Sequence, residues 1–322
     1  MTVPCRPTLT EIAEARARLA PFLDPTPLFR LDIGSTNRRL FLKLETLTPI
    51  GAFKFRPALN AILSRDRAEL RHGVAVPSSG NMAYAMAWAA RAVGVPMAAY
   101  MYRDAPAAKV DGVRALGGEV RFVSRATWWS YIVEAARPEG PELFINPVTD
   151  PAVLAGNGTI GMEIVEALPG VGTILIPFGG GSMTTGVASA AKSLRPETRV
   201  FAVEDTSAAP VGAALAAGAV VQVETRPSFI KSIGGPSVVP QLWPVASGLI
   251  EGAIAVPPEQ VCEAMRLLFS KAKVVAEGAG AAALAAAFDR QDLSGDIVCL
   301  VSGGNIGAAD FATVLTGGIP KA

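Results

Sequence analysis

Short apolar runs alternate with segments of helical periodicity along most of this chain. The apolar runs lie at 73–77, 95–101, 118–123, 142–147, 173–178, 199–204 and 296–304. The helical patterns that follow several of them lie at 81–94, 105–117, 127–137 and 183–194. Because strands that alternate with helices build βαβ units, the pattern predicts an α/β fold with mostly parallel sheets flanked by helices.

Further helices are expected outside this alternation. The first covers 8–23, where Thr8 and Glu11 form a capping box at its start. Another covers 257–272. The alanine-rich segment 278–288 is too short to span a bilayer, so we expect it to be a close-packed core helix.

The length of the chain bears on its domain organisation. A chain of 322 residues favours two lobes that share a cleft. The block 73–145 is interpreted as a small substrate-binding domain, inserted into a large cofactor-binding domain made of 1–72 and 146–322. In open α/β sheets, ligands bind beyond the carboxyl ends of the strands. The loops expected to carry a site are 51–57, 77–81, 178–186 and 302–306.

Composition narrows the class of protein. Half of the residues are hydrophobic and the formal net charge is +1, which gives no electrostatic case for binding nucleic acid or an anionic membrane. Cys5, Cys262 and Cys299 lie far apart in the sequence and form no C-x-x-C motif, which is not the pattern of a disulfide framework and fits a reducing compartment. The N-terminal residues show no signal peptide. We therefore expect a soluble cytoplasmic protein.

The chain contains a single histidine, His72. A Ser-His-Asp triad or a site with several histidine ligands to a metal is therefore not expected. If the protein is an enzyme, its base is a lysine, a carboxylate or a cofactor.

The segment "PFGGGSMTTG" places three consecutive glycines, Gly179–Gly181, between a strand and a helix. Exposed backbone N–H groups ahead of a helix N-terminus form a cradle for an anion, to which the hydroxyls of Ser182, Thr184 and Thr185 could add donors. The segment is neither a Walker A loop nor a G-x-G-x-x-G motif. The alternative is a tight glycine turn that binds nothing.

Two other strand ends carry small and polar residues. "PSSGNMAYA" brings Ser78, Ser79 and Asn81 beside Gly80, and this loop could hold a carboxylate or simply begin a helix. "VSGGNIG" places Ser302 ahead of two glycines. Each motif is weak when taken alone.

Lys54 lies beside an aromatic residue in "GAFKFRP", where a strand gives way to a helix. A lone lysine would be interpreted as a surface charge. Together with a phosphate cradle and a carboxylate-sized loop, it indicates a cofactor that carries both an aldehyde and a phosphate, because a lysine amine can form a Schiff base.

These segments together resemble fold type II pyridoxal-phosphate enzymes, specifically the threonine/serine dehydratase and serine racemase group. The similar segments are "LFLKLETLTPIGAFKFRPALNAI", "SSGNMAYAMAWAA", "DPAVLAGNGTIGMEI", "PFGGGSMTTG", "EGAGAAALAAAF" and "SGGN". The resemblance implies two lobes, each with a mostly parallel sheet flanked by helices, and pyridoxal 5'-phosphate in the cleft between them. It also implies a homodimer.

The resemblance assigns a role to each candidate residue. Lys54 would be the Schiff-base lysine and catalytic base, flanked by Phe53, and Ser302 would face the pyridine nitrogen. Residues Gly179, Gly180, Gly181, Ser182 and Met183 would hold the phosphate. Residues Ser78, Ser79, Gly80, Asn81 and Met82 would bind the substrate carboxylate, with Asn81 near the phenolic oxygen of the cofactor and Ser79 as a second catalytic residue. Glu277 would lie near the ring.

The chain departs from the usual pattern of this group at several positions. Ala52 and Met82 stand where the group usually has serine and histidine, Pro57 replaces a glycine, and Ser182 replaces a fourth glycine. Some relatives bind a divalent cation beyond the strand that ends at Glu204, but Pro210 stands where a second acidic ligand is expected. We therefore expect no metal site.

The implied reaction is the dehydration of an L-3-hydroxy amino acid to a 2-oxo acid and ammonia. The apolar Ala52 and Met82, with Trp128 and Trp129 on one expected helix, favour a side chain bulkier than that of serine, such as threonine or phenylserine. A racemase or a β-replacement synthase on the same fold is an alternative, since Ser79 is compatible with racemisation. A nicotinamide-dependent dehydrogenase, with Glu204 on the ribose, and a binding protein without turnover are further alternatives.

Overall fold

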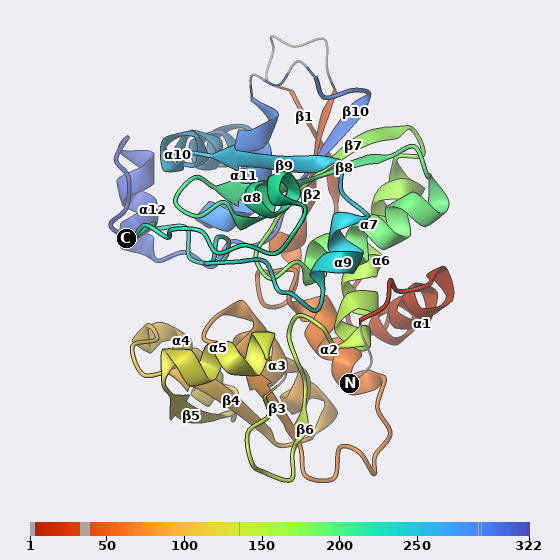
Figure 1. The fold of residues 1–322 in the computed structure, drawn as a ribbon, viewed down its shortest axis with the longest axis vertical. Helices are drawn as coiled ribbons and strands as arrows, with labels where there is room; N and C mark the ends of the chain where they lie inside the picture. The colour runs from red at the N-terminus through yellow and green to blue at the C-terminus, as the bar shows by residue number, and fades with distance from the viewer. Residues whose placement is uncertain (1–3, 33–38, 135, 289, 291) are drawn as a thin grey trace.

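The computed structural model describes residues 4–32, 39–134, 136–288, 290 and 292–322. A six-stranded sheet forms the upper part of the molecule in Figure 1 and has the order β1-β2-β10-β7-β8-β9. Every neighbouring pair in it is parallel except β1 and β2. Its strands are β1 (Leu28–Leu31), β2 (Leu40–Leu44), β7 (Val171–Pro177), β8 (Arg199–Asp205), β9 (Gly252–Val256) and β10 (Asp296–Val301).

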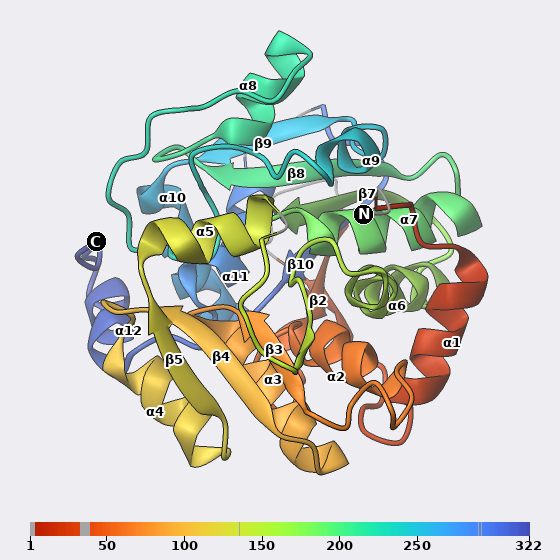
Figure 2. The ribbon, with the colours of Figure 1, turned by 60° about the horizontal axis from the view of Figure 1, so that its bottom comes forward.

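A second, four-stranded parallel sheet forms the lower part and has the order β5-β4-β3-β6. Its strands are β3 (Val74–Pro77), β4 (Met97–Tyr102), β5 (Glu119–Val123) and β6 (Leu143–Phe144). The helices between them are α3 (Asn81–Val93), α4 (Ala107–Ala115) and α5 (Arg125–Val133). In two views of the molecule, α5 lies on the side of this sheet that faces the larger one (Figure 1, Figure 2).

Helices cover both faces of the six-stranded sheet (Figure 2). Along β10, Ile297, Cys299 and Val301 face the core formed with α10 and α11, whereas Val298 and Leu300 face the core formed with α6 and α7. Alternate side chains of a strand point to opposite faces, so a sheet covered on both sides is apolar throughout. The helices around it are α1 (Leu9–Leu19), α6 (Pro151–Ala167), α7 (Ser182–Leu194), α8 (Pro210–Ala217), α9 (Trp243–Ser247), α10 (Pro258–Leu267), α11 (Gly278–Ala287) and α12 (Ala308–Leu315), with short helical turns η1 (Glu45–Leu47) and η2 (Leu268–Ala272).

Helix α2 (Phe55–Leu63) connects the two sheets physically. Phe55, Ala58 and Leu59 belong to the same core as β3, α3 and β4, while Asn60 donates to the Ala152 carbonyl at the start of α6 at 2.8 Å. The residues just before α2, including Lys54, therefore occupy a fixed place between the sheets.

The predicted α/β fold with parallel sheets is confirmed. The capping box at Thr8 and Glu11 is present, although α1 ends at Leu19 rather than at residue 23. The alanine-rich helix α11 is buried along its whole length. Within the described part of the chain, no helix has the length and apolar character needed to cross a membrane.

Candidate active site

Three loops of the larger sheet converge because the strands that carry them are neighbours. Strands β2, β10 and β7 lie side by side and run in the same direction. The Phe53 amide donates to the Ser302 carbonyl at 2.9 Å, and the Gly304 amide donates to the Gly51 carbonyl at 2.9 Å. The segment that carries Lys54 is therefore fastened to the turn that follows β10.

Lys54 directly precedes α2 and is half-buried as a whole residue. Its Nζ atom lies 4.7 Å from the centre of the Phe53 ring. The ammonium end is enclosed by protein without a compensating carboxylate among the described residues, and this burial lowers the pKa of Lys54 to about 8. A part of the amine is therefore neutral near physiological pH, which is the form that attacks an aldehyde or accepts a proton.

The glycine loop after β7 leaves no room for side chains. A Cβ at Gly179 would lie 2.6 Å from the Ser232 carbonyl oxygen, and Gly181 has a φ of +93° with Phe178 Cζ at 2.8 Å from the same hypothetical atom. The chain then enters α7 at Ser182. The bare backbone of this loop, followed by the N-terminus of a helix, fits a phosphate group.

Buried hydroxyls near this loop lack partners inside the protein. The Oγ1 atoms of Thr184 and Thr185 are buried and make no hydrogen bond with the described residues. Leaving such a group unsatisfied costs about 1–3 kcal/mol, so an acceptor or a water supplied from outside the chain is expected there. The residues present therefore fit the phosphate of a bound cofactor.

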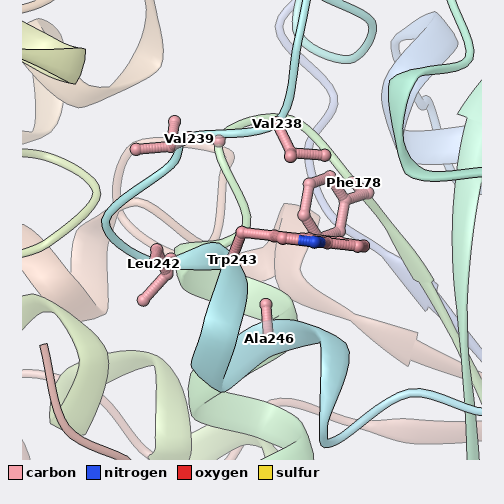
Figure 3. A pocket seen from close by; sticks show the side chains of 7 residues that line it. Phe178, Val238, Val239, Leu242, Trp243 and Ala246 are labelled. Carbon is pink, nitrogen blue, oxygen red and sulfur yellow. The ribbon is translucent and has the colours of Figure 1, made fainter. Parts of the chain in front are cut away.

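A small apolar pocket lies beside the glycine loop (Figure 3). Its lining consists of Phe178, Gly180, Val238, Val239, Leu242, Trp243 and Ala246. None of these side chains is ionisable, and Phe178 and Trp243 lie together in one core cluster. The pocket is therefore part of the apolar packing next to the glycine loop.

The loop after β3 holds the candidate substrate-binding residues. Ser78 Oγ accepts from the Ala83 amide at 3.2 Å, and Ser79 Oγ accepts from the Tyr102 amide at 3.2 Å. A Cβ at Gly80 would meet no atom within 4 Å, so the loop faces open space there. Met82 is 3% exposed and lies in the core with α2 and α3, so only its backbone is placed to contact a ligand.

Asn81 joins this loop to the larger sheet. Its Nδ2 donates to Glu277 Oε1 at 2.9 Å, and Glu277 immediately precedes α11. Burial raises the pKa of Glu277, and nearby Lys109 opposes that shift. The structure thus brings the loops that carry Phe53, Asn81 and Ser302 together, and Glu277 with them.

Three residues near these loops were not singled out by the sequence. Asn305 lies inside the "SGGN" motif without having been given a role, Lys109 lies on α4 with no local motif around it, and Tyr102 ends β4. Only Asn305 carried a local signal. The positions of Lys109 and Tyr102 depend on how α4 and β4 pack.

The Glu204 carboxylate has backbone partners. Its oxygens accept from the amides of Val211 at 2.6 Å and Gly212 at 2.9 Å, in the first turn of α8. Pro210 begins that helix, where a missing N–H costs nothing. No cluster of potential metal ligands occurs among the residues that the structure describes.

Comparison with known proteins gives consistent matches over most of the chain. Residues 19–303 match the family model described as pyridoxal-phosphate dependent enzyme. An L-threonine ammonia-lyase of Geobacter sulfurreducens is 36% identical over 88% of this chain and 71% of its own length. A serine racemase of Arabidopsis thaliana is 32% identical over 92% of this chain and 93% of its own length.

Solved structures show the same fold. Maize serine racemase has a TM-score of 0.88 at 30% identity and covers 97% of this chain and 98% of its own. The T.th. threonine deaminase has a TM-score of 0.82 at 32% identity, with 94% and 99% coverage. These matches support the pyridoxal-phosphate site and not the nicotinamide alternative. The chain belongs to the family of pyridoxal-phosphate-dependent enzymes, has their fold type II architecture, and uses that cofactor.

Proposed function

We propose that this enzyme is a carbon–oxygen lyase that converts an L-3-hydroxy amino acid into a 2-oxo acid and ammonia by α,β-elimination. The observation that carries the proposal is the Lys54 amine, which lies 4.7 Å from the centre of the Phe53 ring and whose pKa is lowered to about 8 by burial. Relatives that are named L-threonine ammonia-lyase support this assignment.

The candidate residues would have distinct roles in binding the cofactor and in catalysis. Gly179, Gly180, Gly181, Ser182 and Met183 would hold the phosphate of the cofactor, and Ser302 would face its pyridine nitrogen. When bound, the cofactor supplies a conjugated ring that withdraws electrons from Cα of the substrate. Lys54, which anchors the cofactor in the resting enzyme, would act as the base that removes the Cα proton.

The loop of Ser78, Ser79, Gly80, Asn81 and Met82 would bind the substrate carboxylate. With the Cα–H bond broken and its proton on Lys54, the Cβ–O bond breaks and Lys54 would pass that proton to the departing hydroxyl, which leaves as water. The unsaturated amine that remains hydrolyses to the 2-oxo acid and ammonia. An amine with a pKa near 8 is well matched to this proton transfer close to neutral pH.

The substrate side chain is inferred to be bulkier than that of serine. Tyr102, whose amide is bonded to Ser79 Oγ, packs edge-on against Trp128 with ring centres 5.5 Å apart. Trp128 also packs against a cluster that includes Val148, and Val148 Cγ2 lies 2.6 Å from where a Gly180 Cβ would be. These contacts link Trp128 to both the substrate loop and the glycine loop, where an aryl or alkyl group on Cβ would contact it.

Assays of product formation test the proposal. Purified enzyme is given L-threonine, L-serine and L-threo-phenylserine, and the release of ammonia and 2-oxo acid is followed together with chiral analysis of the remaining amino acid. Release of ammonia that disappears in Lys54→Met supports the lyase. Conversion of L to D amino acid without ammonia would instead support a racemase, the alternative favoured by Ser79 and by the serine racemases among the relatives. Cofactor binding without either product would indicate a non-catalytic binding protein.

We further propose a homodimer in the cytoplasm, with a small domain at 73–145 inserted into a large domain at 1–72 and 146–322. All strands of the four-stranded sheet come from residues inside 73–145, which supports this division. Light scattering of the purified protein tests the dimer. A monomeric mass at working concentration would remove that part of the proposal.

A further inference from the structure

Three side chains meet around the carboxamide of Asn81. Its Oδ1 accepts from Asn305 Nδ2 at 3.0 Å and from Lys109 Nζ at 3.3 Å, while its Nδ2 donates to Glu277 Oε1 at 2.9 Å. Lys109 and Asn81 come from helices of the four-stranded sheet, whereas Asn305 and Glu277 follow or precede elements of the larger one. The network therefore crosses from one sheet to the other.

The orientation of the Asn81 carboxamide is determined by its partners. Asn305 Nδ2 also donates to the Ile50 backbone carbonyl at 3.0 Å, and a carbonyl can only accept. The Asn305 amino group is therefore the group that faces Asn81, and the atom it meets there must be the oxygen. Lys109, which can only donate, imposes the same orientation from α4.

This orientation leaves one donor of Asn81 available. A carboxamide nitrogen carries two N–H groups, and only the bond to Glu277 is made within the described part of the chain. Asn81 is half-buried at the open side of Gly80, where a Cβ would meet no atom within 4 Å. The second N–H therefore has no partner among the described residues and is available to a ligand on this open side.

We propose that Lys109 and Asn305 are positioning residues, which together hold the Asn81 carboxamide so that its free N–H group donates to the bound cofactor. Lys109 has a second effect through charge. It is the charged group that acts on the buried Glu277 carboxylate and lowers its pKa, against the effect of burial. The ionised carboxylate accepts from Asn81 and so supports the same orientation.

The inference rests on the proposed cofactor site but not on the proposed reaction, because its test measures cofactor affinity. Apo-protein is titrated with pyridoxal 5'-phosphate at constant ionic strength, and quenching of tryptophan fluorescence gives Kd. The variants are Lys109→Met, Lys109→Arg and Arg114→Met. Arg114 is an exposed cation on the same helix, outside the network, and serves as the matched control.

Lys109→Met is expected to raise Kd about tenfold, the size of one hydrogen bond to a charged group. Lys109→Arg, which keeps the donor and the charge, is expected to restore most of the affinity, and Arg114→Met to leave it unchanged. The Tm of each apo-protein is measured alongside. A loss of affinity that Lys109→Arg does not restore, or that Arg114→Met shares, would overturn the proposal.

A double-mutant cycle separates positioning from direct contact. If Lys109 acts through Asn81, then adding Lys109→Met to Asn81→Ala changes Kd by less than about twofold, because no carboxamide remains to be held. Asn305→Asp places a carboxylate against the Asn81 and Ile50 oxygens. It is expected to weaken cofactor binding when Asn81 is present, but not in the Asn81→Ala background. A full tenfold effect of Lys109→Met in the Asn81→Ala background would show that Lys109 contacts the ligand itself and would refute the proposed role.

The dependence of Kd on pH provides a further test, because a merely structural role of Lys109 would leave that dependence unchanged. Without Lys109, the pKa of Glu277 is expected to rise, so that protonation removes its acceptor at a higher pH. On the acid side of the plot of Kd against pH, the rise in Kd should therefore begin at a higher pH in Lys109→Met than in wild type. In Lys109→Arg it should begin at the wild-type pH. Among the described residues, Lys109 is the one charged group that acts on the pKa of Glu277. Superimposable profiles for wild type and Lys109→Met would contradict the inference.

Discussion

The Nη1 atom of Arg56 lies 2.5 Å from Oε1 of Glu163 in the interior of the protein. The same guanidinium also pairs with Glu45, and Glu163 pairs with Lys43. These four side chains, from β2, η1, α2 and α6, are at most 7% exposed and balance two positive charges against two negative ones. They hold the start of α2, and therefore Lys54, against the larger sheet.

Removing Arg56 would leave two buried carboxylates with only Lys43 to compensate them. We expect Arg56→Met to lower the free energy of unfolding by about 3–5 kcal/mol, the usual result of breaking a buried ion pair. Urea denaturation followed by circular dichroism measures the change. The control is Arg16→Met, whose pair with Glu166 is 43% and 53% exposed and should cost no more than about 1 kcal/mol. Equal losses in the two variants would contradict this account.

The lowered pKa of Lys54 predicts how cofactor attachment depends on pH. The neutral amine is the reactive form, so the rate at which apo-protein bonds covalently to pyridoxal phosphate should rise with pH through a midpoint near 8 rather than near 10.5. Stopped-flow absorbance measures that rate. Lys54→Arg, which stays protonated, is expected to form no covalent bond that borohydride can trap. A midpoint above 10 would contradict the effect of burial, because the ordinary value is 10.5.

The contacts of Glu204 predict that activity does not require a divalent cation. Both carboxylate oxygens already accept from backbone amides at the start of α8. Treatment with EDTA followed by gel filtration should leave both the rate of ammonia release and the Tm unchanged. Restoration of a lost activity by added magnesium or calcium would refute this expectation.

The same contacts predict a structural role for Glu204. Glu204→Ala would leave the amides of Val211 and Gly212 without their acceptor, so we expect a loss of about 1 kcal/mol, as for other helix-capping side chains. Glu197→Ala is a suitable control, since Glu197 is exposed and lies just before β8. A Tm for Glu204→Ala equal to that of the control would contradict the capping role.

The place of Trp128 predicts an effect on substrate preference. Its indole nitrogen is buried with no partner among the described residues, and its ring packs against Tyr102. We expect Trp128→Ala to lower kcat/KM for phenylserine by about tenfold or more and to change that for serine much less, because an apolar contact is lost only with the larger substrate. Trp129→Ala, at the neighbouring position, should change neither value. A wild-type kcat/KM for serine about tenfold above those for threonine and phenylserine would remove the basis of this prediction.

Much of the architecture follows from local sequence patterns. The Thr8–Glu11 capping box, the alternation of apolar runs with helical patterns, and the glycine turn at 179–181 depend on neighbouring residues, and the structure contains each of them. Helix α6 (Pro151–Ala167) was not predicted as a helix, because residues on all of its faces are buried along most of its length and it shows no amphipathic period. Strand β9 and helix α8 were likewise missed.

Sequence alone also determined the family and predicted most of the candidate site, because each of its motifs lies within one loop that follows a strand. The motifs at 51–57, 178–186 and 302–306 follow neighbouring parallel strands of the larger sheet, and the motif at 77–81 follows β3 of the four-stranded sheet. Only the tertiary structure decided which isolated residues join them. Lys109 reaches Asn81 from 28 positions away, and Asn305 reaches it from 224 positions away. Such contacts depend on the packing of α4 and on the pairing of strands that are distant in the chain. Neither of these produces a periodicity or a motif spacing that can be recognised in the sequence.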